Sequence, residues 1–417
     1  MSIGIFTISS PLHNAESIAA HRDSYLKELG FEYVMCDNDF SRYGEFELNL
    51  IFILTGGTES LFREKLRELE NRGVRLSYFS LLAYNTDNSL AASMEILSFL
   101  KNKQYDGEIL HGSKEFVLDR VNKLRRVFCA ARTIKGFRAG IIGEPSDWLI
   151  SSTFNRIIVK DRLGVDLVDI PITEVKEIVE QLSKREDKKA VERAQKIREE
   201  FKQIKICPAT EQYIEGAINI YLALKEIVAR YSLNAFTIRC FDLLSAVKNT
   251  GCLALAKLNA EGIVAGCEGD VPAMLSMILA KGLSGVSGFQ ANPAHIDVAT
   301  GEIKFAHCTI PLNMVESYEF LSHFESGIGV GVRGFMKNGP VTIFKLCGNM
   351  ERFFAENGTL VESQEKDNFC RTQQLIKLDN PEAARYFLNN PIGNHHIIIP
   401  GHYSYTLNRV LEKLINN

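Results

Sequence analysis

The sequence lacks the marks of a disulfide-stabilised, zinc-ribbon or membrane protein. It has no CxxC pair, and its nine cysteines are an odd number scattered along the chain. This pattern is typical of reduced thiols in a cytoplasmic protein, so neither a disulfide framework nor a cysteine-based zinc site is expected. No apolar run approaches the roughly 18 residues that a membrane span needs. The first ten residues, MSIGIFTISS, lack the segments of a signal peptide and are expected to form a strand instead.

A large excess of positive or negative charge is also lacking. The 417 residues carry a net charge of -3, with 24% charged and 46% apolar residues, which describes an ordinary globular protein and argues against nucleic acid or a membrane as a partner. The charge-rich stretch 173–205 mixes acidic and basic residues at helical spacing, which favours solvated helices over a nucleic-acid patch. We found no repeats or low-complexity segments.

Apolar runs and amphipathic stretches alternate over the first 285 residues, as in βαβ units with parallel sheets. A new strand near Arg138 indicates a second such domain. Beyond about residue 285 the pattern changes to β-rich runs separated by Gly and Asn-Gly turns. The sequence therefore predicts two doubly wound parallel-sheet α/β domains, 1–135 and 136–284, followed by a β-rich, barrel-like C-terminal domain, 285–417.

Two strand-end motifs have structural explanations as well as functional ones. LTGGTE, at residues 54–59, matches neither a P-loop nor GxGxxG, and a turn with Thr58 as helix N-cap is favoured. GEPSDW, at residues 143–148, is expected to begin a helix capped by Ser146 or Asp147. Its Trp148, the chain's only tryptophan, lies where ligands gather in open α/β sheets and is a candidate for stacking on a sugar.

Acid, base and metal-ligand side chains concentrate in two later segments. Glu268 follows an apolar strand, and Asp270 stands at the expected start of a helix, where an N-cap role competes with a functional one. His307 interrupts an apolar strand, a position where a core histidine is more common than a ligand. His395 and His396 are adjacent, so only one of them can face a given site. Together these residues suit a divalent ion such as Mn, Mg, Co or Zn.

These segments resemble the L-fucose/L-arabinose isomerase superfamily. AGCEGDVPAMLSMILAKGLSG, FQANP and FAHCTIPL resemble the metal-binding segment of arabinose isomerases, and GNHHIIIPGH resembles a C-terminal segment of fucose isomerases. The resemblance implies that Glu268 is both a metal ligand and an acid/base, and that His307 and His395 are ligands, with His396 as the alternative to His395. It also implies a sugar contact for Asn394.

The sequence departs from the family where a second carboxylate is expected. Ala291 and Asn292 occupy that place in FQANP, and Asn292 retains an oxygen ligand but cannot carry a proton as a carboxylate does. The missing role would pass to Asp270, Asp297, His307 or a metal-bound water.

The resemblance predicts a cytoplasmic, metal-dependent aldose-ketose isomerase that acts through a cis-enediol, with Mn²⁺ favoured over Mg²⁺ or Co²⁺. The substrate would be a deoxy sugar, a pentose or a modified hexose such as sulfoquinovose, with Arg239 and Arg333 as candidates for an anionic substituent. The family also implies a homo-oligomer, a trimer or hexamer with shared active sites. The alternatives are a non-catalytic sugar-binding or regulatory protein and a metal-dependent epimerase or lyase.

Overall fold

The computed structural model describes residues 2–74 and 78–416. Its internal contacts divide the chain into two compact units, residues 1–129 and 130–417. We describe each unit by itself. The domain boundaries 135/136 and 284/285 expected from the sequence stay predictions.

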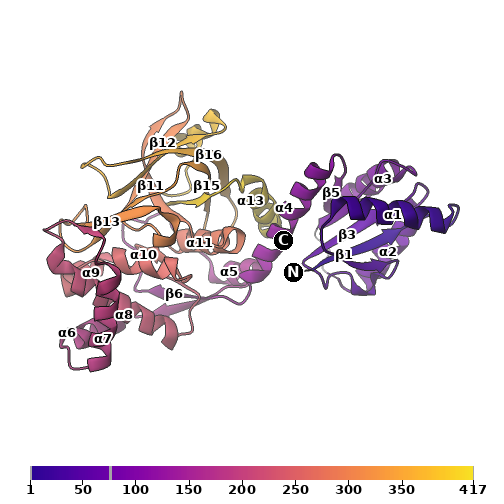
Figure 1. Ribbon diagram of the computed structural model, residues 1–417. Helices are drawn as coiled ribbons and strands as arrows, with labels where there is room; N and C mark the ends of the chain where they lie inside the picture. The colour runs from indigo at the N-terminus through magenta and orange to yellow at the C-terminus, as the bar shows by residue number, and fades with distance from the viewer. Residues whose placement is uncertain (1, 75–77, 417) are drawn as a thin grey trace. The chain divides into compact units, whose positions relative to one another are not determined.

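The first unit is a doubly wound α/β domain. Its five parallel strands lie in the order β2-β1-β3-β4-β5. Helices α1 and α4 pack on one face, and α2 and α3 pack on the other. The elements are β1 (Ile3–Ile8), α1 (Ala15–Leu29), β2 (Val34–Asp37), β3 (Leu48–Ile53), α2 (Glu59–Asn71), β4 (Tyr78–Leu82), α3 (Ser89–Asn102), β5 (Asp106–Leu110) and α4 (Lys114–Thr133) (Figure 1).

Thr58 occupies the predicted N-cap position of α2, but its side chain does not cap the helix. Its Oγ1 instead donates a hydrogen bond to the carbonyl oxygen of Thr55, 2.9 Å away. The LTGGTE motif therefore forms the strand-to-helix turn that the sequence favours.

The second unit begins with another parallel sheet, in the order β10-β9-β6-β7. The mixed-charge stretch forms two helices, as predicted. The elements are β6 (Arg138–Ile142), α5 (Arg156–Leu163), β7 (Asp166–Ile170), α6 (Ile172–Ser183), α7 (Lys188–Glu200), α8 (Ile214–Arg230), β9 (Ala235–Ile238), α9 (Phe241–Val247), α10 (Cys252–Ala260), β10 (Val264–Cys267) and α11 (Val271–Ser284).

A closed antiparallel barrel follows, in the order β11-β12-β17-β16-β15-β18, and β11 pairs with β18 to close it. The predicted fold class, two parallel-sheet α/β parts and a barrel-like C-terminal part, is confirmed. The barrel strands are β11 (Phe289–Asp297), β12 (Glu302–His307), β15 (Gly339–Leu346), β16 (Phe353–Gln364), β17 (Thr372–Leu378) and β18 (His396–Pro400). A smaller sheet joins β8 (Lys205–Ile206), β13 (Ser317–Leu321) and β14 (Gly331–Phe335), and the helices α12 (Arg385–Asn389) and α13 (Ser404–Asn416) complete the unit.

Helix α11 connects the parallel sheet to the barrel. It contacts β9 and β10 on one side and β15 and β18 on the other, and most of its side chains are buried (Figure 1). This position explains its sequence, VPAMLSMILAKGLS, which is apolar around the whole helix instead of along one stripe. The one buried hydroxyl, on Ser276, accepts a hydrogen bond from the backbone N–H of Leu346 in the barrel, at 3.0 Å.

The prediction that a helix begins at GEPSDW, residues 143–148, is wrong. Residues 143–155 form turns and irregular backbone, and the next helix, α5, begins at Arg156 with Asn155 as its N-cap. Asn155 Oδ1 accepts from the N–H groups of Ile157 and Ile158, so a capping signal was present but further along the chain. The segment that carries Trp148 is therefore a loop.

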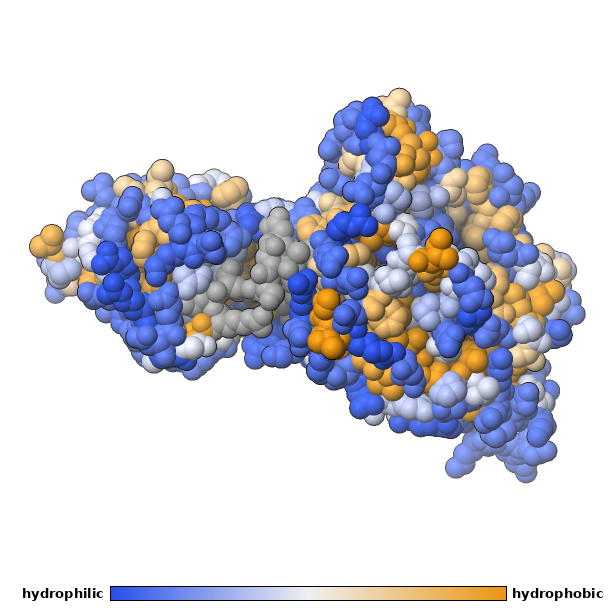
Figure 2. Space-filling view, turned by 180° about the vertical axis from the view of Figure 1, so that it is seen from behind, coloured by the Kyte–Doolittle hydropathy of each residue, from blue (hydrophilic) through white to orange (hydrophobic). Residues whose placement is uncertain are grey.

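No helix within the described ranges 2–74 and 78–416 is long and apolar enough to cross a membrane. Hydrophilic side chains dominate the face drawn in Figure 2, with apolar groups scattered among them.

A smaller side chain in the buried helix α11 should destabilise the second unit. Leu279 has no exposed surface, and Leu279→Ala is expected to lower the free energy of unfolding by about 2–5 kcal/mol because it removes buried methyl groups and leaves a cavity. The control is Ile157→Ala on α5, whose side chain is 72% exposed and should change stability by less than about 0.5 kcal/mol. Urea denaturation of both variants measures the difference, and equal effects would contradict the position assigned to α11.

Candidate metal and sugar site

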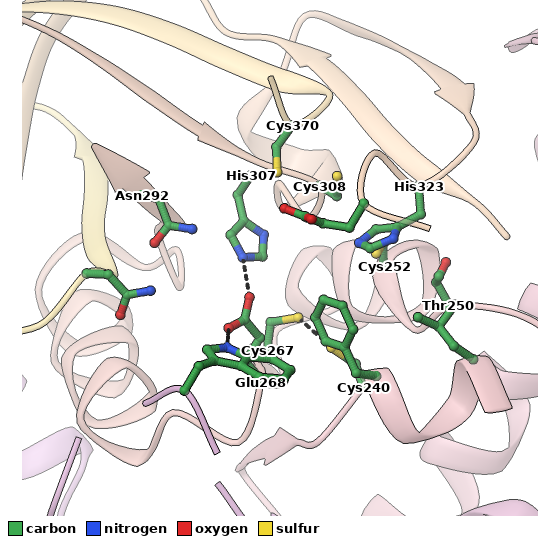
Figure 3. A pocket seen from close by; sticks show the side chains of 15 residues that line it. Cys240, Thr250, Cys252, Cys267, Glu268, Asn292, His307, Cys308, His323 and Cys370 are labelled. Carbon is green, nitrogen blue, oxygen red and sulfur yellow. Dashed lines mark hydrogen bonds and ion pairs between the residues drawn. The ribbon is translucent and has the colours of Figure 1, made fainter. Parts of the chain in front are cut away.

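A cavity of about 400 Å³ lies in the second unit, where the parallel sheet faces the barrel. Residues from four kinds of element line it: the loop after β6, the segments after β9 and β10, the barrel strands, and the segment after β13. The lining residues are Trp148, Cys240, Phe241, Leu244, Thr250, Cys252, Cys267, Glu268, Asn292, His307, Cys308, His323, Glu325, Cys370 and Asn394 (Figure 3). Such a cavity has the size of a small-molecule site.

The parallel strands bring Trp148 and Glu268 together because their carboxyl ends share one edge of the sheet. Glu268 follows β10 directly and adopts a left-handed backbone, with φ of 63°. Gly269 follows with φ of 71°, and a Cβ there would lie 2.7 Å from the carbonyl oxygen of Glu144. Only glycine fits this turn. The N–H of Ser146 donates to the carbonyl oxygen of Glu268, at 3.0 Å, and ties the β6 loop to it.

The barrel supplies the imidazoles and amides. His307 is the last residue of β12, Asn292 pairs with Ala306 across β11 and β12, and His395 immediately precedes β18. His396 begins β18 and points the other way, into a cluster of aromatic rings. The alternation of a strand thus directs only one of the two adjacent histidines, His395, towards Glu268.

Glu268 lies at the centre of the site. Its Oε1 is 3.6 Å from Nε2 of His307 and 3.5 Å from Nε2 of His395. Its Oε2 accepts a hydrogen bond of 2.7 Å from Nε1 of Trp148. Burial would raise the pKa of Glu268, but the interactions with His307 and His395 outweigh it and hold this pKa far below its usual range. The carboxylate is therefore ionised at any physiological pH.

The other ring nitrogens of both histidines are occupied. Nδ1 of His307 lies 2.9 Å from Oγ1 of Thr309, and Nδ1 of His395 lies 2.8 Å from Oδ2 of Asp270. These contacts leave both Nε2 atoms facing the carboxylate of Glu268. With one carboxylate oxygen of Glu268 they form a group whose ligand atoms all lie within 4.8 Å of one another. Histidines oriented through their second nitrogen are typical of metal sites.

Two buried atoms, one on His395 and one on Asn292, lack hydrogen-bond partners. Among the described residues, Nε2 of His395 and Oδ1 of Asn292 are buried and have no hydrogen-bond partner. A buried polar atom without a hydrogen bond is costly, and a divalent ion held by Glu268, His307 and His395 would occupy Nε2 of His395. Glu268, His307 and His395 therefore fit a metal bound by two imidazoles and one carboxylate, a donor set that suits Mn²⁺ or a similar ion.

Asp270 lies behind His395 and does not line the cavity. Its Oδ1 accepts from the N–H of Ala273 as the N-cap of α11, and its Oδ2 contacts His395 and, at 3.4 Å, Nζ of Lys345. Burial would raise the pKa of Asp270, but Lys345 and His395 keep it well below its usual range. All of its oxygens are in use, so its position suits holding His395 and not touching a substrate.

The remaining predicted residues divide between the cavity and other places. Trp148 and Asn394 line the cavity, and the indole of Trp148 is 50% exposed. Nε2 of His396 lies 3.1 Å from the hydroxyl of Tyr386, away from the cavity.

Both arginines proposed for an anionic substituent are outside the cavity lining and are bound to carboxylates. Arg239 donates to Asp147 at 2.8 Å and to Asp242 at 3.2 Å. Arg333 lies 2.8 Å from Glu319 and 3.1 Å from Glu365.

Several lining residues were missed from the sequence. His323 and Glu325 follow β13 in the motif LSHFES, and five thiols line the cavity, among them Cys240 and Cys267, whose sulfurs are 3.1 Å apart (Figure 3). A histidine directly after a strand was the available signal for His323. The thiols are spread over 131 positions and give no local pattern.

Comparison with known proteins agrees with this fold. The family model of the L-arabinose isomerase central domain matches residues 152–283, the part that contains the second parallel sheet and Glu268. Together with the barrel and its histidines, this match supports the chain as a member of the L-fucose/L-arabinose isomerase-like superfamily.

The curated relatives found are sulfoquinovose isomerases. That of Priestia aryabhattai is 24% identical over 277 residues, which cover 62% of this chain and 58% of the relative. That of Alkalicoccus urumqiensis is 23% identical over 225 residues, covering 53% and 49%. That of Clostridium sp. (strain MSTE9) is 30% identical over 131 residues, covering 31% and 28%. The chain thus spans less than two thirds of the length of each of these relatives.

Metal binding should release a proton from His395. Burial would lower the pKa of His395, but Asp270 and Glu268 raise it to about 9, so the metal-free ring is protonated near neutral pH. A metal needs the neutral imidazole, so binding should release about one proton, and affinity should rise with pH until about pH 9. Calorimetry with Mn²⁺ in buffers of different ionisation enthalpy measures the release. Asp270→Asn should reduce it, whereas an unchanged release in this variant would contradict the assigned partner.

Proposed function

We propose that the chain is a metal-dependent aldose-ketose isomerase acting on a free sugar through a cis-enediol. The observation that carries this proposal is the convergence of ligand atoms from Glu268, His307 and His395 at the edge of one cavity, which Glu268 and His307 line. A buried ring nitrogen of His395 and the Asn292 oxygen have no hydrogen-bond partner among the described residues. A bound divalent metal, Mn²⁺ in preference to Mg²⁺ or Co²⁺, would act as a Lewis acid toward the sugar oxygens.

The protein's own groups have distinct proposed tasks. Glu268 moves the proton between C2 and C1 of the open-chain sugar, since its carboxylate lines the cavity and lies within 3.6 Å of Nε2 of both histidines. Trp148 holds this carboxylate through its indole N–H and presents its half-exposed ring to the sugar. Asn394, which also lines the cavity, offers an amide to a sugar hydroxyl. Asp270 and Lys345 fix His395 from behind.

The sugar itself is a deoxy sugar, a pentose or a modified hexose. The names of the relatives favour a test with sulfoquinovose. Oligomeric assembly with shared sites, and a cytoplasmic location, also remain predictions.

Asn292 favours one alternative, a sugar-binding protein that has lost a catalytic carboxylate. Such a protein would bind aldoses without moving their C2 proton. Proton NMR of an aldose panel, including sulfonated sugars, in deuterated water with Mn²⁺-loaded protein separates the two. Exchange at C2 with formation of the ketose supports the isomerase, and binding without exchange supports the alternative.

Glu268→Gln tests the proposed proton transfer. This variant keeps the size of the side chain but removes the base, so isomerisation should fall by about 10²–10⁴-fold or more. Its matched control is Glu382→Gln, an acid-to-amide change at a surface residue of the same unit that pairs with Arg385. The control should retain full activity. Circular dichroism checks folding of both, and full activity in Glu268→Gln would overturn the proposal.

A further inference from the structure

His323 is a cavity residue to which the proposed mechanism gives no task. It follows β13, is 7% exposed, and lines the cavity together with His307 and Glu268. Figure 3 shows its ring on the opposite side of the cavity from Asn292. The ring of Phe241 packs edge-on against it, with 5.6 Å between ring centroids.

The contacts of His323 define its neutral tautomer. The backbone N–H of Ser326 donates to Nδ1 at 3.4 Å, and Oγ of Ser326 lies 3.0 Å from the same atom. Because a backbone N–H can only donate, Nδ1 is the acceptor, and the proton of the neutral ring resides on Nε2. His323 therefore carries an Nε2–H donor.

The surroundings of His323 keep the ring neutral. Burial lowers the pKa of His323, and the neighbouring His307 lowers it further. The acidic neighbours Cys308, Glu325 and Glu268 act in the opposite direction but do not restore the usual value. A neutral imidazole that donates through Nε2–H is the form that serves as an electrophile in enediol isomerases.

The reaction needs such a group because Asn292 replaces a carboxylate. Of the side chains considered as substitutes from the sequence, beside a metal-bound water, Asp270 is enclosed. Asp297 lies outside the cavity lining and accepts from the N–H groups of Ala299 and Thr300. His307 has its Nε2 directed at Glu268. His323 is the remaining imidazole among the lining residues.

Building on the proposed function, we propose that His323 is the second proton-transfer residue, which moves the hydroxyl proton between O1 and O2 of the sugar. As Glu268 takes the proton from C2, the C–H electron pair forms the C1=C2 bond. The C1=O1 π electrons then take the proton from Nε2 of His323. The resulting imidazolate recovers a proton from the O2 hydroxyl, C2=O2 forms, and C1 receives the proton held by Glu268. Both residues end in their starting states.

His323→Gln tests this proposal, with His402→Gln as a matched control. His402 is exposed and lies 3.7 Å from Asp379, outside the cavity lining, so its variant should behave as wild type. In His323→Gln, kcat should fall by about 10²–10⁴-fold while KM changes little. Exchange of the C2 proton with solvent deuterium should fall less than ketose formation, since an enediol that forms can still return its proton to C2.

The pH profile and the tautomer provide readouts that a structural role would not change. Protonation of His323 places a second proton on Nδ1, where the ring accepts from the N–H of Ser326, and so disturbs the position of the ring. Wild-type activity should therefore have an acid limb below the usual histidine pKa, and this limb should be absent from the residual activity of His323→Gln. Nitrogen-15 NMR of the labelled protein, assigned by the signals that this variant loses, should show the neutral Nε2–H form near neutral pH.

The possible failures are distinguishable. Wild-type protein that shows neither exchange nor ketose formation with any aldose would overturn the proposed function. Wild-type activity together with a kcat within about twofold in His323→Gln and an unchanged acid limb would overturn only the role of His323. An Nδ1–H or protonated ring near neutral pH would overturn it as well, even if the variant fails to fold.

Discussion

One buried carboxylate constrains the whole second unit. Glu268 is ionised and 9% exposed, and an unpaired charge at such a position would cost far more than a single contact returns. Its partners come from three separate parts of the chain: Trp148 from the loop after β6, His307 from the end of β12, and His395 from the start of β18. The barrel must therefore close against the carboxyl edge of the parallel sheet. The contacts that form the site are therefore also contacts that pack the barrel against the parallel sheet.

A second pair of buried charges, Asp270 and Lys345, supports the site around Glu268. Asp270 and Lys345 are essentially inaccessible to solvent, and each would be strongly destabilising alone. Asp270 connects the start of α11 to His395 and to Lys345 on β15, so the same helix that fills the space between sheet and barrel also orients His395, a proposed metal ligand. This arrangement explains how a short polar cluster is maintained next to an apolar helix.

The sequence predicts the architecture well because hydrophobic periodicity is a local signal. Alternation indicated both parallel sheets, and Gly-rich β runs indicated the barrel. The same sequence pattern placed Glu268 at the end of a strand. The exact start of one helix was predicted wrongly: the caps proposed at Ser146 and Asp147 were wrong, because the helix starts further on. Contacts between residues far apart in the chain could not be predicted from local patterns. The capping position of Asp270 was correct, but its partner Lys345, 75 residues away, left no trace in the sequence. His323 was missed for the same reason, since only the fold brings β13 to the cavity.

The central claim is that Glu268, His307 and His395 hold one divalent metal in a sugar-sized cavity. The most direct measurement is anomalous X-ray diffraction from crystals of the protein prepared with Mn²⁺. The account predicts one strong anomalous peak within coordination distance of the Glu268 carboxylate, both Nε2 atoms and Oδ1 of Asn292. An absent peak at these residues, or a peak bound by other side chains, would contradict it.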